Sequence, residues 1–456
     1  MRRTLLDELI KFTKKDRVRA HMPGHNGGEG LSRKFRRYAF SVDVTEFSET
    51  DNLQQPTGVL LKSEQRAAEI FGAVRTFFMV GGSTSGLEAA ILTVVGQGQK
   101  VIVDRTCHKA VVSALILAGA EPVFVEPEFD FERGIYLNLS PESVVKALKK
   151  HSDAAAVILT SPSYMGVCSD IRAIAEAVHL AGIPLIVDEA HGAHFVFSDK
   201  LPETALRQDA DIVVQSTHKT LAALGQTALL HIGRGGRIDE ERLLKNINLI
   251  QTSSPSYMLL ASLDEAVRRM DSERLDSVID KIIEIKSRIS VIDNVSCILK
   301  RDLNTDCDMT KLVVNFSKLG ITGYGAAKLL SRDYGIYTEM ADEKNVLFYL
   351  TAAATDKDLN AIDKAICEIA ASEFRPQDII DMRPMPEIVL SENMRNSYFG
   401  KSVSVSLKNA VGRIAAETLV CCPPCSPITV PGQLIDENTA DYIRDFTDIK
   451  KIAVTA

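Results

Sequence analysis

Short apolar runs alternate with longer amphipathic stretches over residues 76–233, and this alternation constrains the fold more than any other feature of the chain. The apolar runs are rich in valine, isoleucine and leucine, as strands buried on both faces are. Strands that alternate with helices form a mostly parallel sheet with helices on both faces, and its ligands bind beyond the carboxyl ends of the strands. The predicted strands are residues 101–104, 122–127, 155–160, 184–188, 211–216 and 228–233.

The chain is too long for one hydrophobic core, because its 456 residues exceed the usual size of a domain. Charged helices are expected around an interruption at residues 251–257, followed by the strand-like runs KLVVNFS and NVLFYLT. The proline-rich and charged stretch FRPQDIIDMRPMPE is the expected link to a last part. We expect an N-terminal segment at 1–60, a large domain at 61–288, a small α+β domain at 289–372 and a C-terminal domain at 373–456.

Charge and hydropathy argue against several classes of protein. The formal net charge of −7 argues against general nucleic-acid binding, because contacts with phosphates need a basic surface. The chain starts without an apolar run long enough for a signal peptide, and no later stretch approaches the roughly 20 apolar residues of a membrane span. We therefore expect a cytoplasmic protein without nucleic-acid or membrane partners. Its 8 cysteines are mostly isolated among apolar neighbours, which is typical of small buried hydrophobes rather than a disulfide framework.

Two charged residues close neighbouring strands at the expected ligand-binding edge. Lys219 lies in the polar turn STHKT after the strand at 211–216, and Asp188 ends the strand at 184–188. A partly desolvated lysine can attack an aldehyde carbon, as a Schiff base with pyridoxal 5′-phosphate (PLP) requires. PLP chemistry also needs a carboxylate that keeps the pyridine nitrogen protonated. Alone, each residue is as readily a surface lysine or a turn-capping aspartate, but together they favour a PLP site.

The glycine-serine turn GGSTSG at residues 81–86 precedes a predicted helix, so free backbone N–H groups gather at a helix N-terminus. Such a terminus favours a phosphate group, although turns of this kind are common. His218 lies beside Lys219 and is a natural further partner of a cofactor phosphate. The hydroxyl groups expected near the phosphate are those of Ser83, Thr84, Ser85 and Ser216.

Histidines after the strands have competing interpretations. His108 follows the strand at 101–104 and could stack on the cofactor ring, although a lone histidine there is more often a helix cap. His191 and His194 in DEAHGAH suggest a metal, but their spacing does not complete a set of zinc ligands. The small Ala190 beside Asp188 better suits a flat ring lying against the backbone. We therefore expect no metal.

The stretch Cys421-Cys422-Pro423-Pro424-Cys425 contains a C-x-x-C spacing, which can indicate redox chemistry or half of a zinc site. A second such pair is missing from the sequence, and the motif does not open a helix after a strand. A proline-rich turn with incidental cysteines is the favoured interpretation.

Together the motifs resemble the Orn/Lys/Arg decarboxylases of the PLP fold-type I, aspartate-aminotransferase-like superfamily, in a short form without an N-terminal receiver-like domain. The resemblance covers nearly the whole chain. It implies an α/β fold class with a mostly parallel seven-stranded-type sheet, a smaller α+β domain and a C-terminal domain. It also implies decarboxylation of a basic amino acid by a homodimer or higher homo-oligomer, with the active site at the interface and QTSSPSY contributing across it. The matching motifs are HMPGH, DVTE, GGSTSG, CHK, DEAHGAH, STHKT, QTSSPSY, VGRI and the Pro-Pro…Pro-Gly pattern at 423–432.

Carried over residue by residue, the resemblance implies that Lys219 forms the Schiff base and Asp188 pairs with the pyridine nitrogen. Ala190 would pack on one ring face and His108 would stack on the other, with His191 near the phenolic oxygen. Either His108 or the released Lys219 would return a proton to the α-carbon. The residues implied around the phosphate are Ser83, Thr84, Ser85, Ser216 and His218.

The chain departs from the family pattern at positions that bear on the substrate. Members usually have Leu-Asp-Asp-Leu-His-His-Pro where this chain has TDNLQQP at residues 50–56. They have Tyr-Pro-Pro-Gly where this chain has CPPC at residues 422–425, and Pro-Gly-Glu where it has Pro-Gly-Gln at residues 431–433. Lost carboxylates weaken the inference to arginine, lysine or ornithine, because a buried cation needs an anionic partner. A PLP enzyme that decarboxylates, transaminates or eliminates from a non-basic or modified amino acid is therefore the open alternative, with a catalytically silent PLP-binding subunit less favoured.

Overall fold

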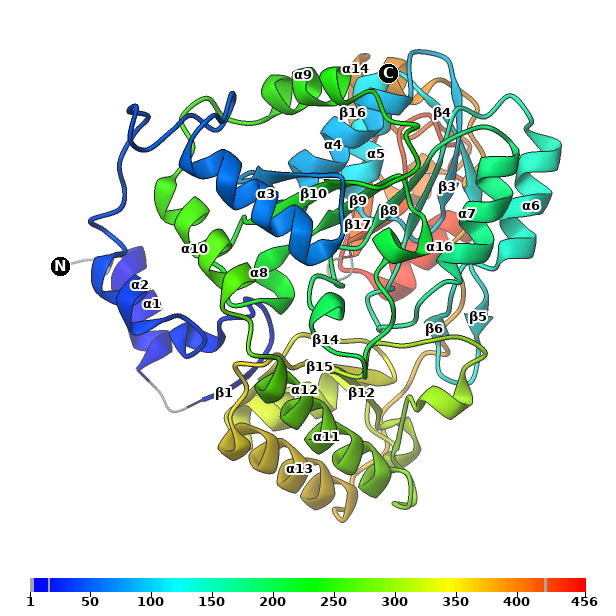
Figure 1. Ribbon diagram of the computed structural model, residues 1–456. Coiled ribbons are helices and arrows are strands. Elements are labelled where there is room, and N and C mark those ends of the chain that lie inside the picture. Colours follow the sequence, from blue (N-terminus) through cyan, green and yellow to red (C-terminus); the bar gives the residue numbers. More distant parts are fainter. Residues whose placement is uncertain (1–3, 15–16, 422–424) are drawn as a thin grey trace.

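A seven-stranded sheet forms the centre of the molecule in the computed structural model, which describes residues 4–14, 17–421 and 425–456 (Figure 1). The strand order is β2-β10-β9-β8-β7-β3-β4. β10 runs antiparallel to both of its neighbours, and the other pairs are parallel. The predicted fold class and all six predicted strands are confirmed. The strands are β2 Arg75–Met79, β3 Lys100–Asp104, β4 Glu121–Val125, β7 Val157–Thr160, β8 Leu185–Asp188, β9 Ile212–Gln215 and β10 Ala228–Ile232.

Helices cover both faces of this sheet and bury one apolar cluster on each side. Alternate residues of a strand enter opposite clusters, as Val187 and Ile186 of β8 do, because side chains alternate along a strand. This explains why the strands have nearly continuous apolar sequences. One face is covered by α3 Val59–Phe71, α6 Pro141–Lys150, α7 Ile171–Leu180 and α10 Tyr257–Arg268. The other is covered by α4 Gly82–Val94, α5 Lys109–Ala118 and α9 Glu240–Ile250.

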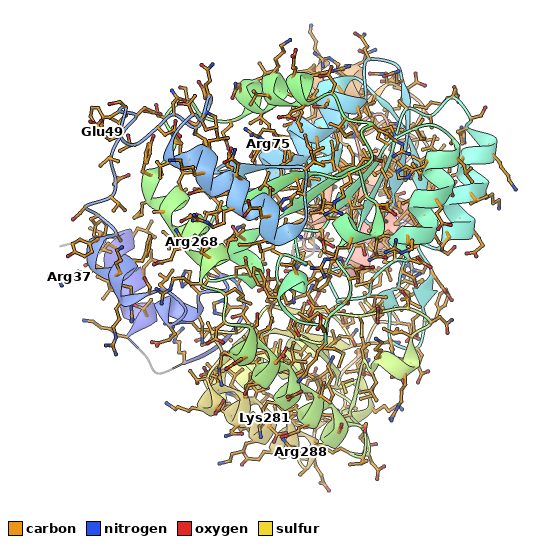
Figure 2. The ribbon with its side chains drawn as sticks, viewed as in Figure 1. Arg37, Glu49, Arg75, Arg268, Lys281 and Arg288 are labelled. Carbon is orange, nitrogen blue, oxygen red and sulfur yellow. The ribbon has the colours of Figure 1, made fainter. Side chains whose placement is uncertain are left out.

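A four-stranded sheet of order β11-β12-β15-β14 forms a second layer, at the bottom of Figure 1. Its helix α11 buries Ile282, Ile285 and Ile289 against this sheet, whereas Lys281 and Arg288 lie at the outer rim of this part in Figure 2. The domain boundaries expected from the sequence stay predictions. The elements are β11 Ser296–Cys297, β12 Lys311–Asn315, β14 Met340–Ala341, β15 Asn345–Tyr349, α11 Ser272–Ile289, α12 Gly323–Asp333 and α13 Asp356–Ala370.

The N-terminal segment is tied to this second layer, because β1 pairs in parallel with β13. No helix among the described residues is long and apolar enough to cross a membrane. The N-terminal elements are α1 Leu5–Thr13, β1 Val18–Ala20 and α2 Arg33–Tyr38. The strands β5 Phe129–Asp130 and β6 Ile135–Tyr136 pair with each other, α8 Thr217–Thr220 follows β9, and β13 Ile336–Thr338 is the partner of β1. The C-terminal elements are α14 Met394–Phe399, β16 Ser402–Ser406, α15 Leu407–Ala410, β17 Leu419–Cys421, β18 Ser426–Thr429, α16 Glu437–Phe446 and β19 Lys451–Thr455.

One fully buried arginine holds the C-terminal part against the large sheet. Arg105 follows β3 and donates hydrogen bonds to the carbonyl oxygens of Pro427, at 2.6 Å, and Pro386, at 2.8 Å. Glu126 lies 3.5 Å from its Nε and supplies an opposite charge. Since these carbonyls belong to the C-terminal part, Arg105 places a second wall beyond the carboxyl end of β3.

Replacing Arg105 by methionine would leave these two carbonyls without donors and Glu126 without its counter-charge. Hydrogen bonds from charged groups contribute about 1.5–3 kcal/mol each, so we expect a clearly lower thermal unfolding midpoint and early protease cleavage within the C-terminal part. The matched control is Arg444→Met, which removes an exposed ion pair with Asp441 and should leave the midpoint unchanged. Equal midpoints for the two variants would contradict the role of Arg105.

Candidate active site

A cavity of about 360 Å³ lies beyond the carboxyl ends of β3, β7 and β8, between the large sheet, the four-stranded sheet and the C-terminal part. Its size is in the range of small-molecule sites. The large sheet contributes Ser83, Thr106, His108, Asp188, Ala190, His191 and Lys219 to its wall. The other two parts contribute, among others, Tyr324, Met340, Asp342, Arg383, Cys425, Ser426 and Tyr442.

Lys219 lies in α8, directly after β9, with its amine facing the cavity. Its Nζ lies 3.1 Å from Nε2 of His191. Burial lowers the pKa of Lys219, and the negative charge of Asp188 opposes this shift. A lysine whose pKa is lowered has more of the neutral amine that attacks an aldehyde.

Asp188 ends β8 and is 3% exposed. Its Oδ1 accepts a hydrogen bond from the backbone N–H of Ala190 at 3.1 Å. Burial raises the pKa of Asp188, whereas the nearby Lys219 lowers it. A buried carboxylate in a cavity wall needs a further N–H donor, and the protonated pyridine nitrogen of PLP fits this requirement.

The start of α4 suits a phosphate group. Ser83 lines the cavity, and Ser216 donates a hydrogen bond to it at 2.9 Å. Gly82 has φ +75° and donates its N–H to the carbonyl of Gln226, which is a conformation that favours glycine. The helix N-terminus and these two hydroxyls together form a small polar end of the cavity that fits the cofactor phosphate.

The other residues predicted around the phosphate lie differently. Thr84 is exposed, and Ser85 donates back to the carbonyl of Gly82 at 3.0 Å within the first turn of its own helix. His218 donates from Nδ1 to the carbonyl of Thr227 at 2.8 Å, and burial lowers its pKa to about 4. The Nε2 of neutral His218 therefore carries no proton, which leaves it an acceptor.

His108 both lines the cavity and caps a helix, so the two interpretations of this residue coexist. Its Nδ1 accepts a hydrogen bond from the N–H of Ala110 at 3.2 Å at the start of α5. Burial lowers the pKa of His108 to about 4. At neutral pH the imidazole is therefore neutral, with its proton on Nε2. Ala190, which is 5% exposed, lies in the same cavity wall.

The two histidines of DEAHGAH point to different places. His191 contacts Lys219, whereas Nε2 of His194 lies 3.2 Å from Oδ1 of Asp308. Among the described residues, no three His, Cys, Asp or Glu side chains gather as a metal site.

The HMPGH segment packs directly on the lysine turn. Gly24 donates its N–H to the carbonyl of His218 at 2.7 Å. A Cβ atom at this position would lie 2.6 Å from the carbonyl oxygen of Leu221 and 2.9 Å from that of Lys219. Only glycine allows this close approach, so the N-terminal segment helps to hold the backbone of Lys219.

Several cavity residues were missed by the sequence analysis. Tyr164 follows β7 and could have been found by the rule that strand ends carry functional groups. Its hydroxyl donates to the carboxylate of Glu339, which also accepts the N–H of Met22. Asp342 also lines the cavity, whereas Lys311 and Glu339 contact residues of its wall. Lys311 begins β12, and Glu339 and Asp342 flank β14. No local pattern distinguishes these three residues, because only tertiary packing brings them to the large sheet.

The departures from the family pattern are divided between structural positions and the cavity wall. Asp51, which the chain shares with the family pattern, accepts the N–H groups of Gly58 and Leu60 at the start of α3. Asn52, which departs from it, accepts the N–H of Gln54 at 2.8 Å within the same loop. Gln433 is fully buried and accepts the N–H of Val430 at 3.1 Å. Cys425 does line the cavity.

Cys425 is disulfide-bonded, which differs from the expected incidental cysteine. Its φ of +64° places it in a tight turn after β17. The remainder of the predicted C-x-x-C turn, residues 422–424, lies outside the described residues. The six cysteines that are free in the described part are mostly buried, as their apolar surroundings in the sequence predict.

An amine and a buried carboxylate that converge from neighbouring strand ends, with hydroxyl groups at a helix N-terminus, define a PLP-dependent enzyme of fold type I. Residues 4–307 match the family model described as Orn/Lys/Arg decarboxylase, major domain. The chain belongs to this family, and it is a PLP-dependent carboxy-lyase that decarboxylates an amino acid.

Full-length relatives carry the same assignment. The chain is 34% identical over 457 residues to an arginine decarboxylase of Halalkalibacterium halodurans, covering 97% of this chain and 92% of the relative. It is 34% identical over 450 residues to an arginine decarboxylase of Bacillus subtilis, covering 95% and 91%. The crystal structure of a Francisella novicida lysine decarboxylase superposes with a TM-score of 0.77, covering 99% of this chain and 80% of that chain. At 17% identity, this last likeness shows the fold alone.

The variant Gly24→Ala tests the contact between HMPGH and the lysine turn. Because the added methyl group would overlap two carbonyl oxygens, overpacking should cost about 1–3 kcal/mol and displace the turn. We expect at least about tenfold weaker PLP binding, measured by titrating the apoprotein and following its visible absorbance. Gly225→Ala is the control, since a Cβ atom there meets nothing within 4 Å. Equal PLP affinity for the two variants would refute this role of Gly24.

Proposed function

We propose that this protein decarboxylates a basic amino acid, either arginine, lysine or ornithine, to the corresponding amine and CO₂, with Lys219 as the attachment site of PLP. One observation carries the proposal. The wall of the cavity that contains Lys219 includes aromatic and methionine side chains, and it also holds the buried carboxylate of Asp342. A cationic side chain would find its anionic partner there, as burial of a charge requires.

The neighbouring arginine does not cancel this charge. Arg383 also lines the cavity, but it forms an ion pair with Asp445 at 2.8 Å and lies over the rings of Tyr442 and Phe446. Asp342 therefore remains the anionic group available to a substrate from this wall. The names of the two arginine decarboxylases that share 34% of the sequence support the same substrate class.

Each residue of the large sheet has a task in this proposal. When bound, PLP accepts the electron pair left by departing CO₂. Asp188 would hold the proton at the pyridine nitrogen, and Lys219 would be the attachment site for the aldehyde carbon. Ala190 and His108 would contact the ring. The residues predicted from the sequence to hold the cofactor are Ser83, Thr84, Ser85, His108, Asp188, Ala190, His191, Ser216, His218 and Lys219. For the phosphate, Ser83 and Ser216 are the better supported, because Thr84 is exposed, Ser85 bonds to its own helix turn and His218 offers only an acceptor.

The protonation states favour one of the two candidate proton donors. His108 has a pKa of about 4 and is neutral near pH 7, so it has no imidazolium proton to give. Burial lowers the pKa of Lys219, but the negative charge of Asp188 opposes this shift and favours the protonated amine. We therefore assign to Lys219 the return of a proton to the substrate α-carbon, and to His108 the positioning of the ring and the substrate carboxylate.

An alternative is a decarboxylase, aminotransferase or eliminating enzyme for a non-basic or modified amino acid. It is favoured by the hydrogen bonds that Asp342 already accepts from Lys344 and Asn345, at 2.8 and 2.7 Å, because these partly satisfy the carboxylate. In that case the same cavity wall would contact the uncharged side chain of a substrate.

To separate these functions, the PLP-loaded protein is incubated with each of the protein amino acids and with ornithine, and CO₂ and amine are measured by mass spectrometry. We expect CO₂ from arginine, lysine or ornithine and from no uncharged amino acid. Formation of a keto acid instead would refute decarboxylation. Lys219→Ala should lose both the reaction and the visible absorbance of the bound cofactor.

The specificity is tested by Asp342→Asn in the same assay. Since a hydrogen bond to a charged group contributes about 1.5–3 kcal/mol, we expect KM for the basic substrate to rise about tenfold or more with less effect on kcat. Glu343→Gln changes the adjacent carboxylate outside the cavity wall and is the control. Unchanged KM in Asp342→Asn would favour the alternative substrate class.

We also propose a cytoplasmic homodimer or higher homo-oligomer. The N-terminal segment and α9 expose large apolar side chains, with Phe40 90%, Phe47 61% and Leu249 74% exposed. Leu249 lies two residues before the QTSSPSY segment, and Phe40 and Phe47 belong to the same N-terminal segment of the sequence as Glu49, which Figure 2 labels. Sedimentation velocity measures the assembly, and a persistent monomer would contradict it.

A further inference from the structure

A second lysine, Lys311, is buried beside the lysine of the active site. It begins β12 of the four-stranded sheet and is 2% exposed. Its side chain crosses to the large sheet, where its Nζ contacts the loop after β7 and His191 after β8. The tasks assigned above to the cavity residues do not use this lysine, and burying it is expensive unless its charge is compensated.

The contacts of Lys311 match the three N–H groups of an ammonium ion. Its Nζ donates to the carbonyl of Tyr164 at 2.8 Å and to that of Ser163 at 3.3 Å. The third neighbour is Nδ1 of His191 at 3.3 Å. The two carbonyls can only accept, and an ammonium ion can donate to both of them and to Nδ1 at the same time.

The surroundings keep this ammonium ion protonated near neutral pH. Burial lowers the pKa of Lys311 to about 8, with Lys219 acting in the same direction and Asp308 and Glu339 opposing it. The rings of Tyr164 and Tyr349 lie 5.5 and 5.1 Å from Nζ, where their faces attract a cation. The thiol of Cys168 is the remaining titratable group that acts on it.

A donor at Nδ1 decides where His191 carries its proton. Burial, together with the positive charge of Lys311, holds the pKa of His191 well below its usual value, so the ring is neutral and has one N–H. If Nδ1 accepts from Lys311, that N–H lies on Nε2. Nε2 is the atom 3.1 Å from Nζ of Lys219. An amine that accepts a hydrogen bond must itself be neutral, and a neutral amine is the nucleophile.

We propose that Lys311 is a positioning residue that holds His191 as the Nε2–H tautomer and thereby keeps Lys219 as a neutral amine. The inference rests on the proposed role of Lys219 as the attachment site. This role of Lys311 also links the two sheets, because Lys311 belongs to the four-stranded sheet, whereas His191 and Lys219 follow strands of the large sheet. A shift of the small sheet would therefore change the protonation of the reactive lysine.

The hydroxyl of Tyr349 is the competing donor, since it lies 3.2 Å from the same Nδ1. Tyr349→Phe removes this hydroxyl and leaves the lysine in place.

A purely structural role for Lys311 can be distinguished from its effect on His191 by a control variant. Lys286 is another lysine of this part that is 3% exposed, and its pKa is lowered by burial, but it lies on α11 beside Cys297 and Cys307. Lys286→Met is therefore the matched control for burial of a lysine without contact to His191.

The first measurement is the ¹⁵N spectrum of the histidine rings in the apoprotein, with His191 assigned through His191→Gln. We expect the wild-type ring and Tyr349→Phe to be protonated at Nε2, and Lys311→Met to shift toward the Nδ1–H form. Lys286→Met should match the wild type. A wild-type His191 protonated at Nδ1 would overturn the proposal, whether or not Lys311→Met folds.

The second measurement is the pH dependence of the rate at which Lys219 of the apoprotein reacts with PLP, trapped by borohydride and located by peptide mass spectrometry. Lys311→Met should slow this reaction near pH 7 by about tenfold or more, while Lys311→Arg restores most of the rate. A rate for Lys311→Met within twofold of Lys286→Met would refute the inference. Labelling at a lysine other than 219 would instead refute the proposed function, while the ring spectra would still test the tautomer.

Discussion

Burial of opposite charges at neighbouring strand ends is the constraint on which the site depends. Lys219 after β9 and Asp188 at the end of β8 each lose water, which disfavours the charged form of both, and each charge opposes the shift of the other. Such a pair is unfavourable for stability unless further donors and acceptors surround it. The two side chains therefore face a cavity made for a molecule that brings its own polar groups.

The rest of the chain supplies what this pair lacks. Gly24 presses the N-terminal segment against the lysine turn, and His191 supplies a partner to Nζ. Arg105 attaches the C-terminal part, and with it a cavity wall that contains Cys425 and Ser426. The large sheet thus provides the groups that suit the cofactor, whereas the two other parts complete the cavity wall. In the proposed function these two parts face the substrate, so substitutions there would change substrate choice without altering the cofactor site.

The sheet and its reactive edge were accessible from sequence for a simple reason. Strands buried on both faces are continuously apolar, so β3, β7, β8 and β9 stand out against the amphipathic helices between them. The polar residue that ends such a strand marks the ligand edge, which identified Lys219, Asp188 and His108. Local pattern was less informative about side-chain direction. Ser83 and Ser85 occupy the same motif, yet one faces the cavity and the other bonds to its own helix turn.

By itself the sequence determined the α/β class, six of the seven strands of the large sheet and the lysine and carboxylate that line the cavity, because these follow from periodicity and from residues adjacent to strand ends. Only the tertiary structure decided that Lys311, Glu339 and Asp342 join them. Each lies in or directly beside a strand of the four-stranded sheet, more than 90 residues after Lys219, and nothing in its local sequence reports what it packs against. The protonation of His108 and His191 was likewise decided by tertiary structure, since burial and the charges of residues distant in sequence set the pKa of a ring.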